Sequence, residues 1–60
     1  MNLLKLRTSS GFSQEFLARQ MEVSRTTIVN WERGKTEPSA SEAIKLARIF
    51  GVTVEYLMGG

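Results

Sequence analysis

The sequence contains no cysteine and no histidine in its 60 residues. The two side chains that most often bind transition metals are therefore missing, along with the thiol nucleophile and the usual general base at neutral pH. A disulfide framework is also excluded, which fits a protein of the reducing cytoplasm. These absences predict a protein without a metal or a cofactor, and they argue against an enzyme.

Long apolar runs are absent as well. The segment Met1 to Lys5 is too short and too interrupted for a signal peptide, and no stretch approaches the roughly 20 residues of a membrane span. We find no repeat, linker or low-complexity segment, while 42% hydrophobic and 23% charged residues are typical of a folded protein. We therefore expect one cytoplasmic domain over residues 1–60, with a core too small to hold a deep catalytic cleft.

Glycine and hydroxyl side chains divide the chain into segments with helical apolar spacing. Glycines suited to left-handed C-terminal caps follow such segments at Gly11, Gly34 and Gly51. Hydroxyls that can accept hydrogen bonds from free backbone amides precede such segments at Ser13, Ser24, Ser39 and Thr53. The pattern predicts an all-α fold, a compact five-helix bundle with helices near Asn2–Ser9, Ser13–Met21, Ser24–Arg33, Ser39–Phe50 and Thr53–Met58.

The start at Ser39 carries the strongest local signal. Glu42 follows three residues later and completes a reciprocal capping box, while Pro38 stops a helix from running across the junction. Every predicted helix contributes apolar side chains to the expected core, which comprises Leu6, Leu17, Ala18, Met21, Val23, Ile28, Trp31, Ile44, Leu46, Ala47, Phe50, Val52, Val54 and Leu57.

The most informative stretch spans residues 14–33. Only Glu22 and Val23 separate its two short helices, with Ser24 as the cap of the second, so the chain must turn a sharp corner. Helices that meet at a steep angle need a small residue where their axes approach, and Ala18 is placed for this role. The pattern is that of a helix-turn-helix.

The stretch SQEFLARQMEVSRTTIVNWERGKTEPS resembles the Cro- and Xre-like helix-turn-helix family of phage repressors. The likeness covers nearly the whole chain, because the tail LARIFGVTVEYLMG is similar to the endings that complete a five-helix, lambda-repressor-like DNA-binding domain. The resemblance implies a structural ion pair between Arg7 and Glu32. One departure is Glu22, at a turn position that usually holds glycine, where a positive φ costs about 1 kcal/mol.

Helical geometry separates two faces of the segment 24–33, at about 100° per residue. Ile28 and Trp31 fall on one side, and this position favours core packing of Trp31 over stacking on a base. The side chains on the other side lie within an arc of about 140°, and they are Arg25, Thr26, Val29, Asn30 and Arg33.

Four of these side chains suit the edges of bases in the major groove. Arg25 can donate to guanine, and Asn30 can pair with adenine. Thr26 can form a hydrogen bond with a base or touch a thymine methyl group, and Val29 offers an apolar contact to the same methyl groups. We expect these four residues to contact bases; the alternative is a solvated helix surface.

Side chains that flank this helix are expected to contact phosphates, and they are Gln14, Thr27, Arg33, Lys35 and Thr36. The role of Gln14 is implied by the family resemblance, whereas Arg33 and Lys35 place positive charge where the chain leaves the groove. The formal net charge is only +2, so the distribution of charge rather than its total indicates nucleic acid.

Two further features have open alternatives. The short apolar run from Tyr56 to Met58 could join two subunits or seal the last helix onto the core. Lys45 and Arg48 lie three residues apart and most simply form a solvated face.

The sequence therefore predicts a transcriptional regulator, a repressor by preference, that binds double-stranded DNA at a near-palindromic site as a homodimer. An autoregulating antitoxin and the targeting domain of a larger regulator share the same module. A protein-interaction adaptor is the alternative of a different class, and the basic residues Arg25, Arg33 and Lys35 argue against it.

Overall fold

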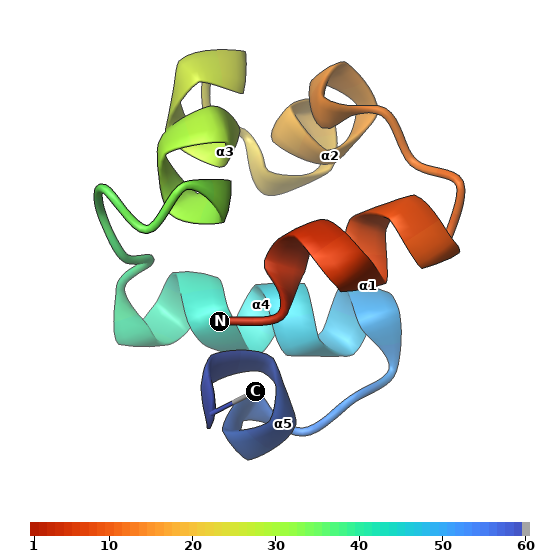
Figure 1. Cartoon of the computed structure of the whole chain (residues 1–60), viewed down its shortest axis with the longest axis vertical. Coiled ribbons are helices and arrows are strands. Elements are labelled where there is room, and N and C mark those ends of the chain that lie inside the picture. The colour runs from red at the N-terminus through yellow and green to blue at the C-terminus, as the bar shows by residue number, and fades with distance from the viewer. Residues whose placement is uncertain (60) are drawn as a thin grey trace.

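The computed structural model describes residues 1–59, so Gly60, at the end of the predicted domain, lies outside the described residues. Residues 1–59 fold into five helices, which are α1 (Leu3–Ser9), α2 (Gln14–Met21), α3 (Arg25–Glu32), α4 (Ala40–Phe50) and α5 (Val54–Gly59) (Figure 1). No strand occurs within residues 1–59. The predicted all-α fold and helix order are confirmed, and the bounds differ by one residue because most predicted ranges included the caps.

Hydroxyl side chains begin four of the helices, as predicted. Ser13 Oγ accepts from the amide of Phe16 at 3.0 Å, and Thr53 Oγ1 accepts from the amide of Tyr56 at 3.0 Å. At the start of α4 both bonds of the capping box form, one from the Glu42 amide to Ser39 Oγ at 3.2 Å and one from the Ser39 amide to Glu42 Oε1 at 2.8 Å. These bonds satisfy amides that a helix leaves without partners at its start.

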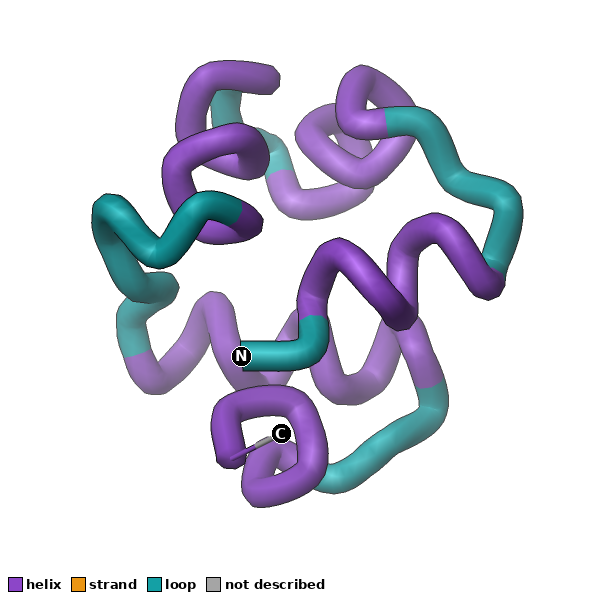
Figure 2. The backbone as a smooth tube through the Cα atoms, viewed as in Figure 1, coloured by secondary structure: helices purple, strands orange, loops and turns teal. Residues whose placement is uncertain are grey.

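The helix α1 begins differently, because its N-cap Asn2 makes no side-chain bond to the helix. Its backbone amide instead donates to the carbonyl of Leu57 at 2.8 Å, and its side-chain amide donates to the carbonyl of Tyr56 at 2.9 Å. Both ends of the described chain are thereby joined, with α5 lying beside the first residues (Figure 2).

Left-handed residues end the helices where the sequence predicts it. Gly51 caps α4 with φ of 66°. Glu22 caps α2 with φ of 59°, the only positive φ of a non-glycine residue among residues 1–59. The amides of Glu22 and Val23 return to carbonyls of the last turn, so the two-residue turn into α3 is fixed by backbone hydrogen bonds.

The core gathers side chains from every helix. Its fully or nearly buried members are Leu3, Leu17, Ala18, Met21, Ile28, Trp31, Ala43, Leu46, Ala47 and Leu57. The predicted core residues Leu6, Val23, Phe50 and Val52 are partly buried and pack against this cluster. Ile28 and Trp31 bury one flank of α3 in this core, so the helix packs against the rest of the molecule on that side.

The prediction of burial is wrong for two residues. Ile44 is 44% exposed and Val54 is 38% exposed, while Ala43 and Leu3, which the prediction omitted, are buried. In α4 the inward side chains are Ala43, Leu46 and Ala47, and a rotation of about 100° per residue carries Ile44 outward.

The helices are arranged so that α3 lies at one edge of the molecule. In Figure 1, α2 and α3 form the upper part, α1 and α4 cross below them, and α5 closes the lower end. Contacts join α2 to α3, α1 to α3, α2 to α4 and α4 to α5. The molecule measures 24 × 23 × 18 Å along its principal axes.

The left-handed position of Glu22 generates a stability prediction. We expect Glu22→Gly to leave the melting temperature unchanged or to raise it, because glycine removes a steric cost of about 1 kcal/mol while adding freedom to the unfolded chain. Glu22 Oε2 also lies 3.5 Å from Lys45 Nζ, but the Glu22 side chain is 85% exposed, so this ion pair contributes little.

Thermal unfolding followed by circular dichroism measures the change. Glu22→Ala is the control, because it removes the ion pair and keeps the strained backbone. A clear loss of stability in the glycine variant would show that the turn is not limited by the conformation of residue 22.

Candidate nucleic-acid interface

The helix α3 has a buried flank and an open flank. Ile28 is fully buried and Trp31 is 4% exposed, which confirms that the tryptophan belongs to the core. On the open flank Arg25 and Thr26 are exposed, and Val29 and Asn30 are half-buried. The four predicted base-contacting residues therefore lie away from the core and share one surface, which we call the α3 surface.

The start of α3 is held by its own cap. Ser24 Oγ accepts from the amide of Thr27 at 3.2 Å, and the hydroxyls of Ser24 and Thr27 share a hydrogen bond at 3.0 Å. Arg25 is the first residue of the helix and carries its side chain at this end. The hydroxyl of Thr27, predicted to contact a phosphate, is thus already engaged in fixing the helix start.

The exit from α3 is also fixed by the backbone. The amides of Lys35 and Thr36 both donate to the carbonyl of Asn30, at 2.9 and 3.5 Å. Gly34 adopts a φ of 75°, which lets the chain reverse at this point. Arg33, Lys35 and Thr36 are exposed after the turn, next to the end of the α3 surface.

The cations near α3 have no acidic partners. Among residues 1–59, Arg25, Arg33 and Lys35 form no ion pair, whereas the ion pairs that do form join Arg7 to Glu32 and Lys45 to Glu22. Their charges are therefore directed to solvent and remain available to an anionic ligand. The α3 surface and its flanks carry free positive charge on a chain whose total charge is small.

Arg7 and Glu32 meet as the family resemblance implies. The Arg7 guanidinium donates through Nε and Nη2 to the two carboxylate oxygens of Glu32, and through Nη1 to the carbonyl of Phe12 at 2.7 Å. The side chains are 12% and 5% exposed, so the pair is largely screened from water. The last residue of α3 is thereby tied to α1 and to the loop before α2.

Gln14 joins this network. Its Nε2 donates to Glu32 Oε1 at 3.0 Å, so the side chain predicted to contact a phosphate is bound to the last residue of α3. The sequence contains no signal for this contact, since it depends on how α2 and α3 cross. One amide hydrogen and the carbonyl oxygen of the Gln14 side chain remain for another partner.

The apolar run at the end of the chain and the two cations of α4 are the remaining predicted features. Leu57 is fully buried and Met58 packs against the core, so both help to seal α5 onto the molecule, while Tyr56 is 46% exposed. Lys45 is not merely solvated, because it reaches Glu22 across the gap between α4 and the turn. Arg48 is exposed. No helix within residues 1–59 is both long and apolar enough to cross a membrane.

The two short helices, the tight turn and the exposed flank of the second helix are the parts of a helix-turn-helix. A family model described as helix-turn-helix matches residues 3–57, and the chain belongs to this family. The predicted resemblance is thereby confirmed. The family consists of DNA-binding transcription regulators, so the comparison supports DNA binding and gives no sign of an enzyme.

Several curated proteins are similar to the chain. The HTH-type transcriptional activator BcrR of Enterococcus faecalis is 41% identical over 97% of this chain and 28% of its own length. The uncharacterized HTH-type transcriptional regulator MJ0272 of Methanocaldococcus jannaschii is 45% identical over 82% of this chain and 74% of its own. The SPbeta prophage-derived regulator YonR of Bacillus subtilis is 38% identical over 97% of this chain and 54% of its own.

The chain thus spans only about a quarter of BcrR and about half of YonR. No solved structure matches it.

The partly buried ion pair of Arg7 and Glu32 leads to a second stability prediction. We expect Arg7→Met to lower the free energy of unfolding by about 3 kcal/mol, because the Glu32 carboxylate stays in place without its counterion. The double variant Arg7→Met/Glu32→Leu should recover much of the loss, since both charges are then removed from the interior.

Urea denaturation followed by circular dichroism measures both changes. Lys45→Met is the matched control, because it breaks the exposed pair with Glu22 and should cost less than about 1 kcal/mol. Equal losses in the two single variants would contradict a special role for the Arg7–Glu32 pair.

Proposed function

We propose that the protein binds double-stranded DNA sequence-specifically by inserting α3 into the major groove. The observation that carries the proposal is the asymmetry of α3, with Ile28 and Trp31 buried on one flank and polar side chains open on the other. A helix with its side chains is about 10–12 Å in diameter and fits a major groove about 12 Å wide. Family membership supports DNA binding independently.

Four side chains of the α3 surface are proposed to read bases. Arg25 stands at the helix end that enters the groove first, and its guanidinium can donate two hydrogen bonds to guanine. Asn30 suits adenine, while Thr26 and the half-exposed Val29 suit thymine methyl groups. Because the Ser24 cap fixes the start of α3, these side chains are presented in a constant register.

Phosphate contacts are proposed on both sides of the groove. Arg33, Lys35 and Thr36 follow α3, and their charges and hydroxyl are exposed there. Gln14 and Thr27 stand at the other side, at the starts of α2 and α3. Both side chains already hold intramolecular bonds, so their phosphate contacts use the remaining amide hydrogen of Gln14 and the hydroxyl proton of Thr27, with Ser24 then donating the bond that the two hydroxyls share.

We further propose that two copies bind together on a near-palindromic site. One module of this size covers too little DNA to be selective by itself. Paired recognition helices meet successive major grooves about 34 Å apart, and the 24 Å length of the molecule lets two touching copies reach this order of spacing. The exposed side chains of Val54 and Tyr56 place an apolar surface on α5 for the contact.

In the cytoplasm such a dimer would act as a repressor. A bound dimer blocks the same DNA to other proteins, and this requires no second protein-binding surface. One similar protein, BcrR, is named an activator. A reporter gene placed behind the selected site distinguishes the two outputs, since deletion of the protein raises expression under repression and lowers it under activation.

Selection of bound sites from a random duplex library tests the proposed reading. We expect an enriched sequence with two-fold symmetry. Arg25→Ala should weaken binding to it by about 1–3 kcal/mol and relax the preference at one position of each half-site. The matched control is Arg48→Ala, an exposed arginine on α4 whose loss should leave the preference unchanged. An unenriched library, or unchanged selectivity in the Arg25 variant, would refute base reading by this helix.

Lys35 provides a separate test of phosphate contact. Binding measured at several salt concentrations should show a log–log slope that is smaller by about 0.9 in Lys35→Ala, because one phosphate contact is lost. The order of preferred sequences should not change. A shifted preference with an unchanged slope would assign Lys35 to base reading instead.

A further inference from the structure

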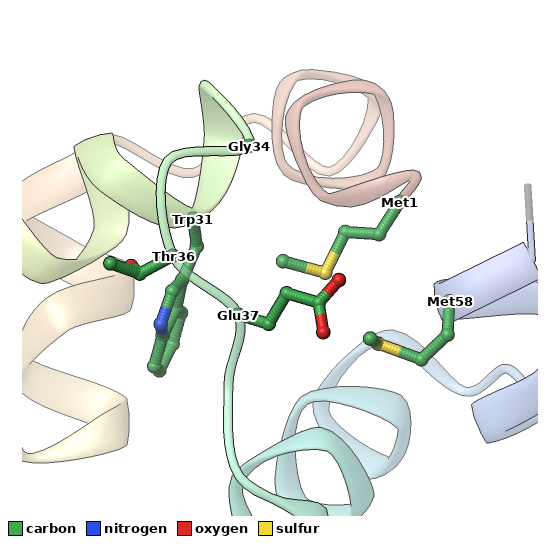
Figure 3. A pocket seen from close by; sticks show the side chains of 6 residues that line it. All are labelled: Met1, Trp31, Gly34, Thr36, Glu37 and Met58. Carbon is green, nitrogen blue, oxygen red and sulfur yellow. The ribbon is translucent and has the colours of Figure 1, made fainter.

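A small pocket lies beside the loop that follows α3, where the two ends of the described chain meet (Figure 3). It is lined by Met1, Trp31, Gly34, Thr36, Glu37 and Met58. Its volume of about 70 Å³ is well below the roughly 300–1,000 Å³ of pockets that hold drug-sized molecules. The pocket therefore suits an ion or a very small ligand.

The lining offers soft electron-pair donors. The chain has three methionines and no cysteine, so its thioethers are its only sulfur atoms. Met21 is 5% exposed in the core, and the other two methionines both line this pocket. Figure 3 shows the thioethers of Met1 and Met58 on either side of the Glu37 carboxylate, with the indole of Trp31 across the loop from them. No lysine or arginine lines the pocket.

Backbone hydrogen bonds bring the two methionines together in advance of any ligand. Asn2, next to Met1, donates its backbone amide to the carbonyl of Leu57, next to Met58, at 2.8 Å. The side-chain amide of Asn2 donates to the carbonyl of Tyr56 at 2.9 Å. Because the neighbours of both methionines are joined, little chain ordering is needed to place the thioethers around a common ligand.

We propose that this pocket binds a soft monovalent metal ion of the Cu(I) class. Thioethers select Cu(I) over hard cations, and the Glu37 carboxylate supplies a negative charge. Within residues 1–59 no group of three or more acidic residues could hold a metal, so a hard divalent cation lacks ligands. The lack of cysteine and histidine predicts no metal site, but the thioethers of methionine are soft ligands as well.

The site is linked in space to the α3 surface. Thr36 and Glu37 belong to the loop that carries Lys35, and Trp31 belongs to α3 itself. An ion that orders this loop would change DNA affinity, and DNA would change ion affinity by the same factor. This link rests on the proposed function, whereas the ion site does not.

Titration of the full chain with Ag(I), a stable analogue of Cu(I), tests the site in chloride-free buffer. Trp31 is the only tryptophan, so its fluorescence reports directly on the pocket. We expect saturable quenching at one ion per chain, with affinity at least about tenfold lower in Met58→Leu and in Glu37→Gln. Met21→Leu is the matched control, because it removes the buried thioether and should bind Ag(I) as the unaltered protein does.

Methyl NMR of the methionines gives a second readout that does not depend on folding energy. The methyl signals of Met1 and Met58 should shift on addition of Ag(I), and that of Met21 should stay in place. Undiminished affinity in Met58→Leu, a shifted Met21 signal, or equal quenching by Zn(II) would overturn the proposal. These measurements contain no DNA, so their failure would leave the proposed DNA binding standing, and failure of DNA binding would leave the ion site standing.

Discussion

The position of α3 depends on one partly buried interaction, the ion pair between Arg7 and Glu32. Glu32 is the last residue of α3, where the helix macrodipole is negative and a lone carboxylate is unfavourable. The guanidinium of Arg7 offsets both the dipole and the burial of the carboxylate, and it binds the carbonyl of Phe12 as well. The helix α1, which supplies none of the proposed DNA contacts, therefore helps to set the orientation of the segment that would make them.

The Glu32 carboxylate also joins α2 to α3. The tight turn alone would leave the angle between these two helices free to change. The turn at Glu22 fixes where α3 begins, and the bond from Gln14 to Glu32 fixes the far end of α3 against the start of α2. A helix held at both ends and along one flank keeps its open side chains in a defined arrangement. Rigidity of this kind is what discrimination between base edges requires.

Much of this arrangement could be predicted because it follows from local rules. Capping by Ser39 and the left-handed turn at Glu22 depend on residues a few positions apart, and the split of α3 into two flanks depends only on the helical period. The core was less predictable. Ile44 and Ala43 are neighbours in α4, and hydrophobicity favours the larger residue inside, yet close packing of the helices places the alanine there. The contact from Gln14 to Glu32 depends on that packing too, and the sequence alone does not reveal it.

The hydrogen bonds of Asn2 with Tyr56 and Leu57 make the fold nearly circular. Chain ends that lie this close can be spliced by a short peptide, and the backbone can then be opened elsewhere. An exposed site such as Gly11, between α1 and α2, would provide new ends without cutting a helix. Opened there, the chain would encode the helices in the order α2, α3, α4, α5 and α1, which keeps α2, the tight turn and α3 in one uninterrupted segment.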